Sequence, residues 1–301
     1  MVSENKQSAF AIWISLISNI ILTTVKLAVG LIFNSPVLIA DGVHNAGDIV
    51  ATGAALSSMR VSKLPPDEDH PYGHGKAEVI SAGIVAIILV MAGIYMGYHS
   101  VTVLFEPPQK ASVIALIAAG FSLVLKQILY VYTMSVGKKN NSNGLIATAY
   151  DHLADVYASI AAVIGIGLAL IGDYYQMTLL SYGDPIAGII VAYFVLRLAI
   201  HMGKSSVGVL MEKNVDSEKM NALINLVREV PDVKRIDRIR ARDHGHYIIV
   251  DVRVSIPAQL SVQEGHDISR QIKHSIIEHH PEVEEVLVHL NPWYEDNTNP
   301  L

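Results

Sequence analysis

Long apolar stretches fill the first two thirds of the chain, and shorter amphipathic patterns fill the last third. The apolar stretches cover residues 9–33, 37–59, 77–104, 112–136, 145–171 and 185–204. Each has at least the ~20 residues that an α-helix needs to cross ~30 Å of hydrocarbon. The pattern therefore predicts an α-helical membrane protein with six transmembrane helices.

After residue 206 the periodicity changes to that of a small α+β domain. Helical spacing or strand alternation is found in turn at residues 216–229, 233–242, 247–256, 262–279 and 285–290. The order αββαβ predicts a C-terminal cytoplasmic domain of about 85 residues, a size at which an independent core is expected. We therefore divide the chain into a transmembrane domain at 1–206, a cytoplasmic domain at 207–292 and a loose tail at 293–301.

Composition agrees with a membrane protein and argues against other classes. Only 17% of the residues are charged, where soluble domains have about 25%. The chain has no cysteine, which excludes disulfides and thiolate metal sites. The net charge of −6 and the lack of a basic stripe argue against nucleic acid. No nucleophile–base arrangement or phosphate loop indicates an enzyme, and we expect no organic cofactor.

The charges in the loops predict the topology. Positive side chains gather in the loops that would share one side of the membrane: Arg60, Lys63, Lys76, Lys138, Lys139 and Lys204. By the positive-inside rule both termini are then cytoplasmic. The N-terminus has no cleavable signal peptide, so we expect the first helix to be retained.

Polar side chains within the second and fifth apolar stretches are the main candidate site. The second stretch carries Asp41 and Asn45, and the fifth carries Asp151 and Asp155. A spacing of four places each pair on one helix face, and a carboxylate at bilayer depth costs ~2.5 kcal/mol or more. An all-oxygen set suits a divalent ion such as Mn²⁺, whereas imidazole favours Zn²⁺. The alternative is that these acids cap or hydrogen-bond neighbouring helices.

Other polar residues have weaker claims to chemistry. His44 and Asp48 are candidates for a secondary ligand or proton relay, or for a hydrogen bond to another helix. In the next loop, Asp67, His70 and His74 predict a surface metal site or a solvated polar loop. Two further observations are that Lys126 lies in mid-span, where it can snorkel or pair with an acid, and that Asp184 is placed to cap the sixth span.

The chain resembles the cation diffusion facilitator family over essentially its whole length. The resemblance is carried by the acidic second span followed by HPYGHGKAE, the fifth-span sequence AYDHLADVYAS, DPIAG at the sixth span, and the αββαβ domain. It implies a metallochaperone-like or ferredoxin-like cytoplasmic domain. It also implies a homodimer in the cell membrane that exports divalent metal in exchange for protons by alternating access. The implied tetrahedral transport site consists of Asp41, Asn45, Asp151 and Asp155.

Two departures from the zinc-type pattern bear on the cargo. Zinc members usually have histidine where Asp151 stands and aspartate where Asn45 stands, so the chain resembles the bacterial manganese-exporting branch. A zinc, iron, cobalt or cadmium exporter is the alternative, and a non-transporting metal sensor or scaffold is another.

The resemblance also implies roles for residues outside the membrane. It assigns Asp67, His70 and His74 to a loop metal site, and Lys76 with Glu212 to a charge interlock between subunits. It maps a cytoplasmic metal cluster onto Asp237, Asp251, His266 and His289. Two of these four are aspartates where zinc members have histidine, which favours a weaker regulatory site over a binuclear zinc site.

Overall fold

The computed structural model describes residues 2–107, 110–139 and 143–294. They form two compact units. The first contains Met1–Ala54 and Ile84–Gly203, and the second contains Ala55–Gly83 and Lys204–Leu301. The loop predicted to carry a metal site thus groups with the C-terminal part of the chain, which composition alone does not reveal.

The six predicted membrane helices are confirmed, although the first begins seven residues earlier and the last ends six residues later than predicted. They are α1 (Val2–Ile32), α2 (Pro36–Ser62), α3 (Lys76–Val103), α4 (Val113–Lys139), α5 (Asn143–Tyr175) and α7 (Gly183–Leu210). A short helix that was not predicted, α6 (Thr178–Ser181), lies in the loop before α7. Among the described residues, five helices are long and apolar enough to cross a membrane. The sixth is α2, whose 27 residues include Asp41, His44, Asn45 and Asp48.

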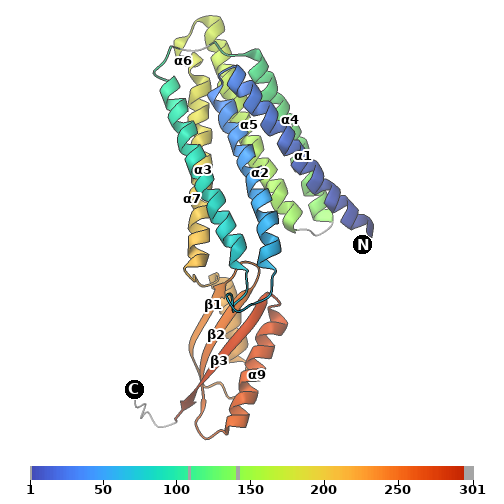
Figure 1. The fold of residues 1–301 in the computed structure, drawn as a ribbon, viewed down its shortest axis with the longest axis vertical. Helices are drawn as coiled ribbons and strands as arrows, with labels where there is room; N and C mark the ends of the chain where they lie inside the picture. The colour runs from blue at the N-terminus through green and yellow to red at the C-terminus, as the bar shows by residue number, and fades with distance from the viewer. Residues whose placement is uncertain (1, 108–109, 140–142, 295–301) are drawn as a thin grey trace. The chain divides into compact units, whose positions relative to one another are not determined.

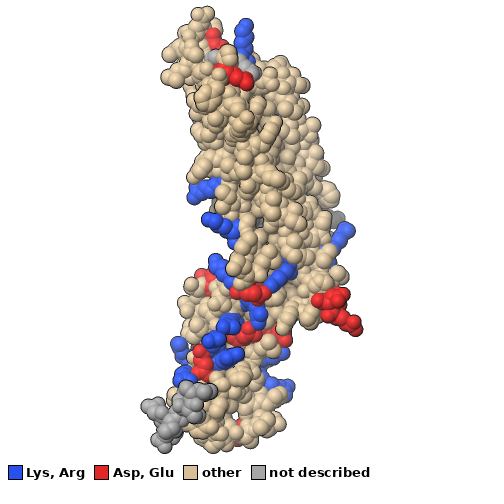
Figure 2. Space-filling view, turned by 60° about the vertical axis from the view of Figure 1, so that its left-hand side comes forward, with Lys and Arg blue, Asp and Glu red and all other residues tan. Residues whose placement is uncertain are grey.

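The outer surface of the bundle is apolar, as a lipid-facing surface must be. Large side chains such as Ile94, Phe121 and Ile164 are more than half exposed. On the face drawn in Figure 2, the middle of the helical bundle is almost free of Lys, Arg, Asp and Glu, whereas the α+β part carries many charged side chains. Backbone polar groups are satisfied within the helices, which is the requirement for crossing hydrocarbon.

Small residues bring α1 and α2 into close contact. A Cβ atom on Gly42 would lie 2.9 Å from Leu27 Cδ2 and 3.2 Å from the Leu27 backbone nitrogen, and one on Gly30 would lie 3.0 Å from the Ile39 nitrogen. Small residues at such contacts let membrane helices approach closely. The approach places the middle of α1 against the polar face of α2.

Asp184 caps a different helix from the one predicted. Its Oδ2 accepts a 2.5 Å hydrogen bond from Ser35 Oγ, and its Oδ1 accepts a 2.9 Å bond from the backbone nitrogen of Val37. Both donors lie at the start of α2, where the first N–H groups have no partner within the helix. The prediction that Asp184 caps its own span was therefore wrong. The start of α2 is about 150 residues away in the sequence, so the sequence alone does not show that it lies beside Asp184.

Replacing Asp184 with alanine is expected to destabilise the bundle by about 1–3 kcal/mol, because the buried Ser35 O–H and Val37 N–H both lose their acceptor. Thermal unfolding of the purified protein in detergent measures the loss. Glu106→Ala, in an exposed loop, is the control. Equal melting temperatures for the two variants would contradict this role of Asp184.

The cytoplasmic part has the predicted αββαβ order. Its elements are α8 (Ser217–Arg228), β1 (Arg235–Asp243), β2 (Ile248–Pro257), α9 (Val262–His279) and β3 (Val283–Trp293). The sheet order is β1-β2-β3, with β1 antiparallel and β3 parallel to β2. The parallel pair requires a crossover connection, which α9 provides. Figure 1 shows α9 beside the sheet.

The core of this domain lies between the helices and the sheet. Leu223 and Val227 of α8 and Ile272 of α9 pack in one buried cluster with Val250 and Val252 of β2. Ser261 and Glu264 form a capping box at the start of α9.

The last strand is longer than predicted. It covers 11 residues, because β2 pairs with it from Val283 to Trp293, with one irregularity at Glu284. Part of the predicted loose tail is therefore strand, and residues 295–301 lie outside the described residues.

Candidate metal transport site

The polar face of α2 lies inside the bundle. Asp41 and Asn45 are one turn apart, and neither has any exposed surface. Asp41 Oδ2 lies 2.7 Å from Lys26 Nζ of α1, and both of these side chains are 0% exposed. Ser159 Oγ of α5 donates to the same carboxylate at 3.4 Å. The Asp41 carboxylate, which the sequence singled out because an acid is costly within a membrane, is thus buried and paired with the Lys26 ammonium group.

Asn45 connects α2 to α5. In the amide orientation that satisfies its neighbours, its nitrogen donates to Asp155 Oδ1 at 3.0 Å and its oxygen accepts from Lys26 Nζ at 3.2 Å. Asp41, Asn45 and Asp155 therefore belong to one buried polar network. The i, i+4 spacing in two separate helices was the sequence signal for this convergence.

Asp155 is the most connected acid of the network. Its side chain is 2% exposed and its Oδ2 accepts a hydrogen bond from Lys126 Nζ of α4. His44 Nε2 lies 3.6 Å from Oδ1, and His152 Nδ1 lies 3.9 Å from Oδ2. Polar groups from α1, α2, α4 and α5 thus meet in the network that contains Asp155. This convergence is expected of a binding site within a helical bundle.

His44 and Asp48, which the sequence predicted only as secondary ligands or relay groups, lie close to Asp155. Ligand atoms of His44, Asp48 and Asp155 all lie within 4.8 Å of one another. This is one of two such groups of three among the described residues. A nitrogen ligand is therefore within reach of the oxygen set.

Asp151 lies apart from this network. It is exposed, one turn before Asp155 on α5, and it is not in either group of three. Its neighbour His152 points inward, where its Nε2 lies 3.0 Å from Ser15 Oγ of α1. Of the four predicted transport ligands, the structure brings three together and leaves Asp151 at the edge.

Sequence reasoning missed Lys26 and assigned no role to Lys126. Each is a single ammonium group within an apolar span, and such a charge marks a functional site by default. The partner of Lys26 is Asp41, 15 residues away, and the partner of Lys126 is Asp155, 29 residues away. Each partner lies on another helix, so spacing rules within one helix cannot connect them.

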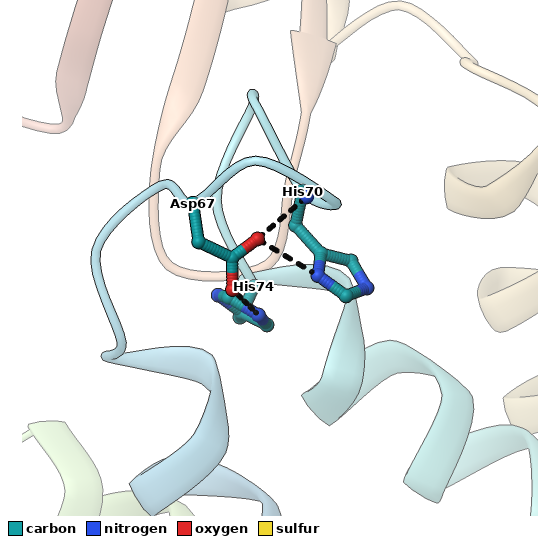
Figure 3. A group of neighbouring side chains, drawn as sticks. All are labelled: Asp67, His70 and His74. Atoms are coloured by element: carbon teal, nitrogen blue, oxygen red, sulfur yellow. Dashed lines mark hydrogen bonds and ion pairs between the residues drawn. The ribbon is translucent and has the colours of Figure 1, made fainter.

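Figure 3 shows the second group of three, in the loop before α3. Asp67 Oδ1 accepts from the His70 backbone nitrogen at 2.6 Å and lies 3.1 Å from His70 Nδ1, while Oδ2 lies 3.3 Å from His74 Nε2. The backbone hydrogen bond of His70, followed by its ring and by His74, holds the pKa of Asp67 below its usual value. The carboxylate is thus ionised at neutral pH, as a metal ligand requires.

Glu212 connects the end of α7 to this loop and to β1. Its φ of 60° is a left-handed conformation that costs a non-glycine residue roughly 1–2 kcal/mol. Lys76 donates to Oε1, and Arg242 Nη1 lies 3.5 Å from Oε2. Burial alone would raise the pKa of Glu212, but Lys76, His244 and Arg242 hold it below its usual value. The stabilising pair is therefore fully formed at neutral pH and is lost as pH falls through that lowered pKa.

The pair of Lys76 and Glu212 lies within one chain. Its predicted role as an interlock between subunits stays a prediction.

The four residues predicted as a cytoplasmic metal cluster do not converge within one chain, although Asn291 bridges Asp237 and His289. Asp237 accepts from Ser255 Oγ and Asn291 Nδ2, both at 2.8 Å, and Asp251 Oδ2 lies 2.5 Å from Arg242 Nη2. The other two are exposed on separate elements, with His289 Nε2 near Asn291 and His266 near Asp267. Among the described residues of this domain, no three ligand groups converge.

The comparisons with known proteins agree with this architecture. Residues 12–211 match the cation efflux transmembrane domain, and residues 215–293 match the cytoplasmic domain of cation efflux proteins. The chain belongs to the cation efflux family, the cation diffusion facilitators. This cation efflux protein is a multi-pass membrane protein with a cytoplasmic C-terminal domain, and it is a divalent-metal transporter rather than an enzyme.

Its relatives match along nearly the whole chain. The manganese efflux system protein MneP of Bacillus subtilis is 46% identical over 98% of this cation efflux protein and 100% of the relative. MneS of the same organism, also described as a manganese efflux system protein, is 31% identical over 96% and 97%. Metal tolerance protein 2 of rice is 30% identical over 96% of this chain and 79% of the relative.

Proposed function

We propose that this protein exports Mn²⁺ from the cytoplasm in exchange for protons. The observation that carries the proposal is the buried network of Asp41, Asn45 and Asp155, which joins two helices through carboxylate and amide oxygens. Such oxygens are the ligands that Mn²⁺ prefers. The similarity to MneP and MneS, both described as manganese efflux proteins, supports the same cargo.

Exchange with protons follows from ligand chemistry. A metal ion requires its carboxylate ligands deprotonated, so metal and protons compete for the same oxygens. Binding at the middle of the bundle, followed by rocking of the helices, would expose the ion to the other side of the membrane. We expect Asp151, exposed one turn from Asp155, to complete the ligand set as the helices move.

The cell assay for this proposal is Mn²⁺ tolerance. Cells that lack their own manganese exporter are grown with and without this chain, at rising Mn²⁺ concentrations. The proposal predicts that the chain restores growth and lowers cellular manganese. No gain in tolerance, with the chain present in the membrane, would contradict it.

A second cargo is favoured by one specific observation. His44 shares a group of three ligand residues with Asp48 and Asp155, and imidazole shifts preference towards Zn²⁺. A zinc-type exporter of the same fold would use this group instead of Asn45 and Asp41. Transport assays with several metals decide between the two sets.

We propose further that Asp67, His70 and His74 bind a metal ion in the loop. Replacing Asp67 with alanine is expected to weaken this site at least ~10–100-fold, because removing even an outer-shell partner of a metal costs that much. Calorimetric titration of the full-length protein with Mn²⁺ and Zn²⁺ should then show one site fewer per chain. Asp69→Ala, an exposed acid of the same loop, is the control. Unchanged stoichiometry in Asp67→Ala would contradict the loop site.

Assembly and location complete the proposal. We place the protein in the plasma membrane as a homodimer, with the N-terminus on the cytoplasmic side. The homodimer is supported by the match of the cytoplasmic domain to a family that is named for dimers. In a dimer, Asp237, Asp251, His266 and His289 would form any cytoplasmic metal site from two chains. Lys76 and Glu212 would contribute to the contact between subunits.

A further inference from the structure

Two lysines are fully buried within the helical bundle. Lys26 of α1 and Lys126 of α4 are each 0% exposed and are the largest fully buried side chains among the described residues. Burying an ammonium group is costly unless it is paired, and each of the two is paired with a carboxylate of the candidate transport site. Such a costly arrangement calls for a function beyond packing.

The lysines bond to the oxygens that a metal ion needs. Lys26 Nζ lies 2.7 Å from Asp41 Oδ2 and 3.2 Å from the Asn45 oxygen, and Lys126 Nζ donates to Asp155 Oδ2. Oxygen ligands approach a divalent ion to roughly 2.0–2.6 Å. An ammonium group and a divalent ion therefore cannot share these lone pairs, and metal binding has to break the ion pairs.

The charges also match. Two ammonium groups on two carboxylates supply the charge that a single divalent ion would bring. When the ion leaves, the lysines can return, so the interior of the bundle does not have to hold two unpaired acids. Lys26 comes from α1 and Lys126 from α4, whereas the candidate ligands come from α2 and α5. The exchange can therefore accompany a movement of α1 and α4 relative to α2 and α5.

We propose that Lys26 and Lys126 are tethered cations that a divalent ion displaces from Asp41 and Asp155 during transport. The inference builds on the proposed metal transport by the same site. Both residues are positioning residues: they act through the carboxylates and do not touch the metal.

Lys126 has a second acceptor that can hold it after displacement. Asn19 Oδ1 of α1 accepts from Lys126 Nζ at 2.6 Å. The ammonium group can therefore release Asp155 and keep one hydrogen bond. Asn19 thereby lowers the cost of the displaced state, and its removal should act on metal binding in the opposite direction from removal of Lys126.

The test is the Kd for Mn²⁺ of the purified full-length protein, measured calorimetrically, together with KM and kcat in proteoliposomes. Lys126→Met and Lys26→Met remove the competing cation and should bind Mn²⁺ about tenfold more tightly or better, with lower KM and lower kcat because release slows. Lys126→Arg should stay near wild type. Lys138→Met, at the exposed end of the same helix, is the matched control.

Asn19→Leu keeps every charge and provides a second variant if the methionine variants fold poorly. It should weaken Mn²⁺ binding about tenfold, because the displaced ammonium group would lose the hydrogen bond that Asn19 provides after displacement, whereas without metal it still has Asp155. In the double variant Asn19→Leu/Lys126→Met this loss should vanish, since without the lysine Asn19 has nothing to hold.

The outcomes separate this inference from the proposed transport function. Wild-type protein that neither binds nor moves a divalent metal would overturn the transport function and the inference with it. Wild-type Mn²⁺ transport, combined with unchanged or weaker binding in both methionine variants, would overturn the inference alone. Unchanged binding in Asn19→Leu would overturn the role of Asn19 as the second acceptor.

Discussion

Replacing Asp155 with asparagine is expected to reduce Mn²⁺ transport at least about 100-fold, the upper end of what loss of an outer-shell partner costs. Asp155 lies where Asn45, His44 and Lys126 converge, and it is the acid shared by the network and by the group of three ligand residues. Asparagine keeps the size of the side chain and an oxygen that Lys126 can still donate to. The loss should therefore reflect the missing charge.

Initial rates of Mn²⁺ uptake in proteoliposomes, at equal amounts of inserted protein, measure this effect. The control is Asp173→Asn near the end of the same helix, where the carboxylate accepts a hydrogen bond from the backbone of Ala111 and lies outside both groups of ligand residues. Transport by Asp155→Asn at the wild-type rate would contradict the assignment of Asp155 to the transport site.

Exchanging the two residues that depart from the zinc pattern is expected to change the cargo. Asp151→His introduces an imidazole one turn from Asp155, and Asn45→Asp adds a carboxylate to the buried set. Since imidazole shifts preference towards Zn²⁺, we expect the ratio of Zn²⁺ to Mn²⁺ transport to rise roughly tenfold, or about 1.4 kcal/mol, in the double variant.

Competition between the two metals in the same vesicles gives this ratio directly. The single variants show which position carries it. A double variant that transports both metals in the wild-type ratio would contradict the assignment of selectivity to ligand type, while leaving the transport function intact.

The sequence predicted the elements well because their periodicity is local. The helix at 262–279 was predicted from its periodicity with the bounds that the structure shows, and the capping box of Ser261 and Glu264 holds its start. The loop group of Asp67, His70 and His74 was found for the same reason, as residues three and four apart in a tight loop contact one another. Local spacing was sufficient for these features.

What the sequence could not give were partners from distant helices. Lys26 was missed, and Asp184 was assigned to the wrong helix, because the partner in each case depends on which helices pack together. The exposed position of Asp151 has the same origin: the i, i+4 rule places it on the face of Asp155 but does not say where that face ends. The pairing of α2 with α5 was predicted from the matching i, i+4 spacing in the two helices, and the resemblance to a family agreed with it.

The most direct test of the account is metal and proton flux in proteoliposomes of the wild-type protein. A set of divalent metals is offered one at a time, with a fluorescent reporter for the metal and a pH dye inside the vesicles. We expect Mn²⁺ uptake accompanied by proton movement in the opposite direction. Strong Zn²⁺ transport without Mn²⁺ transport would contradict the assigned cargo, and Mn²⁺ uptake without proton movement would contradict the exchange.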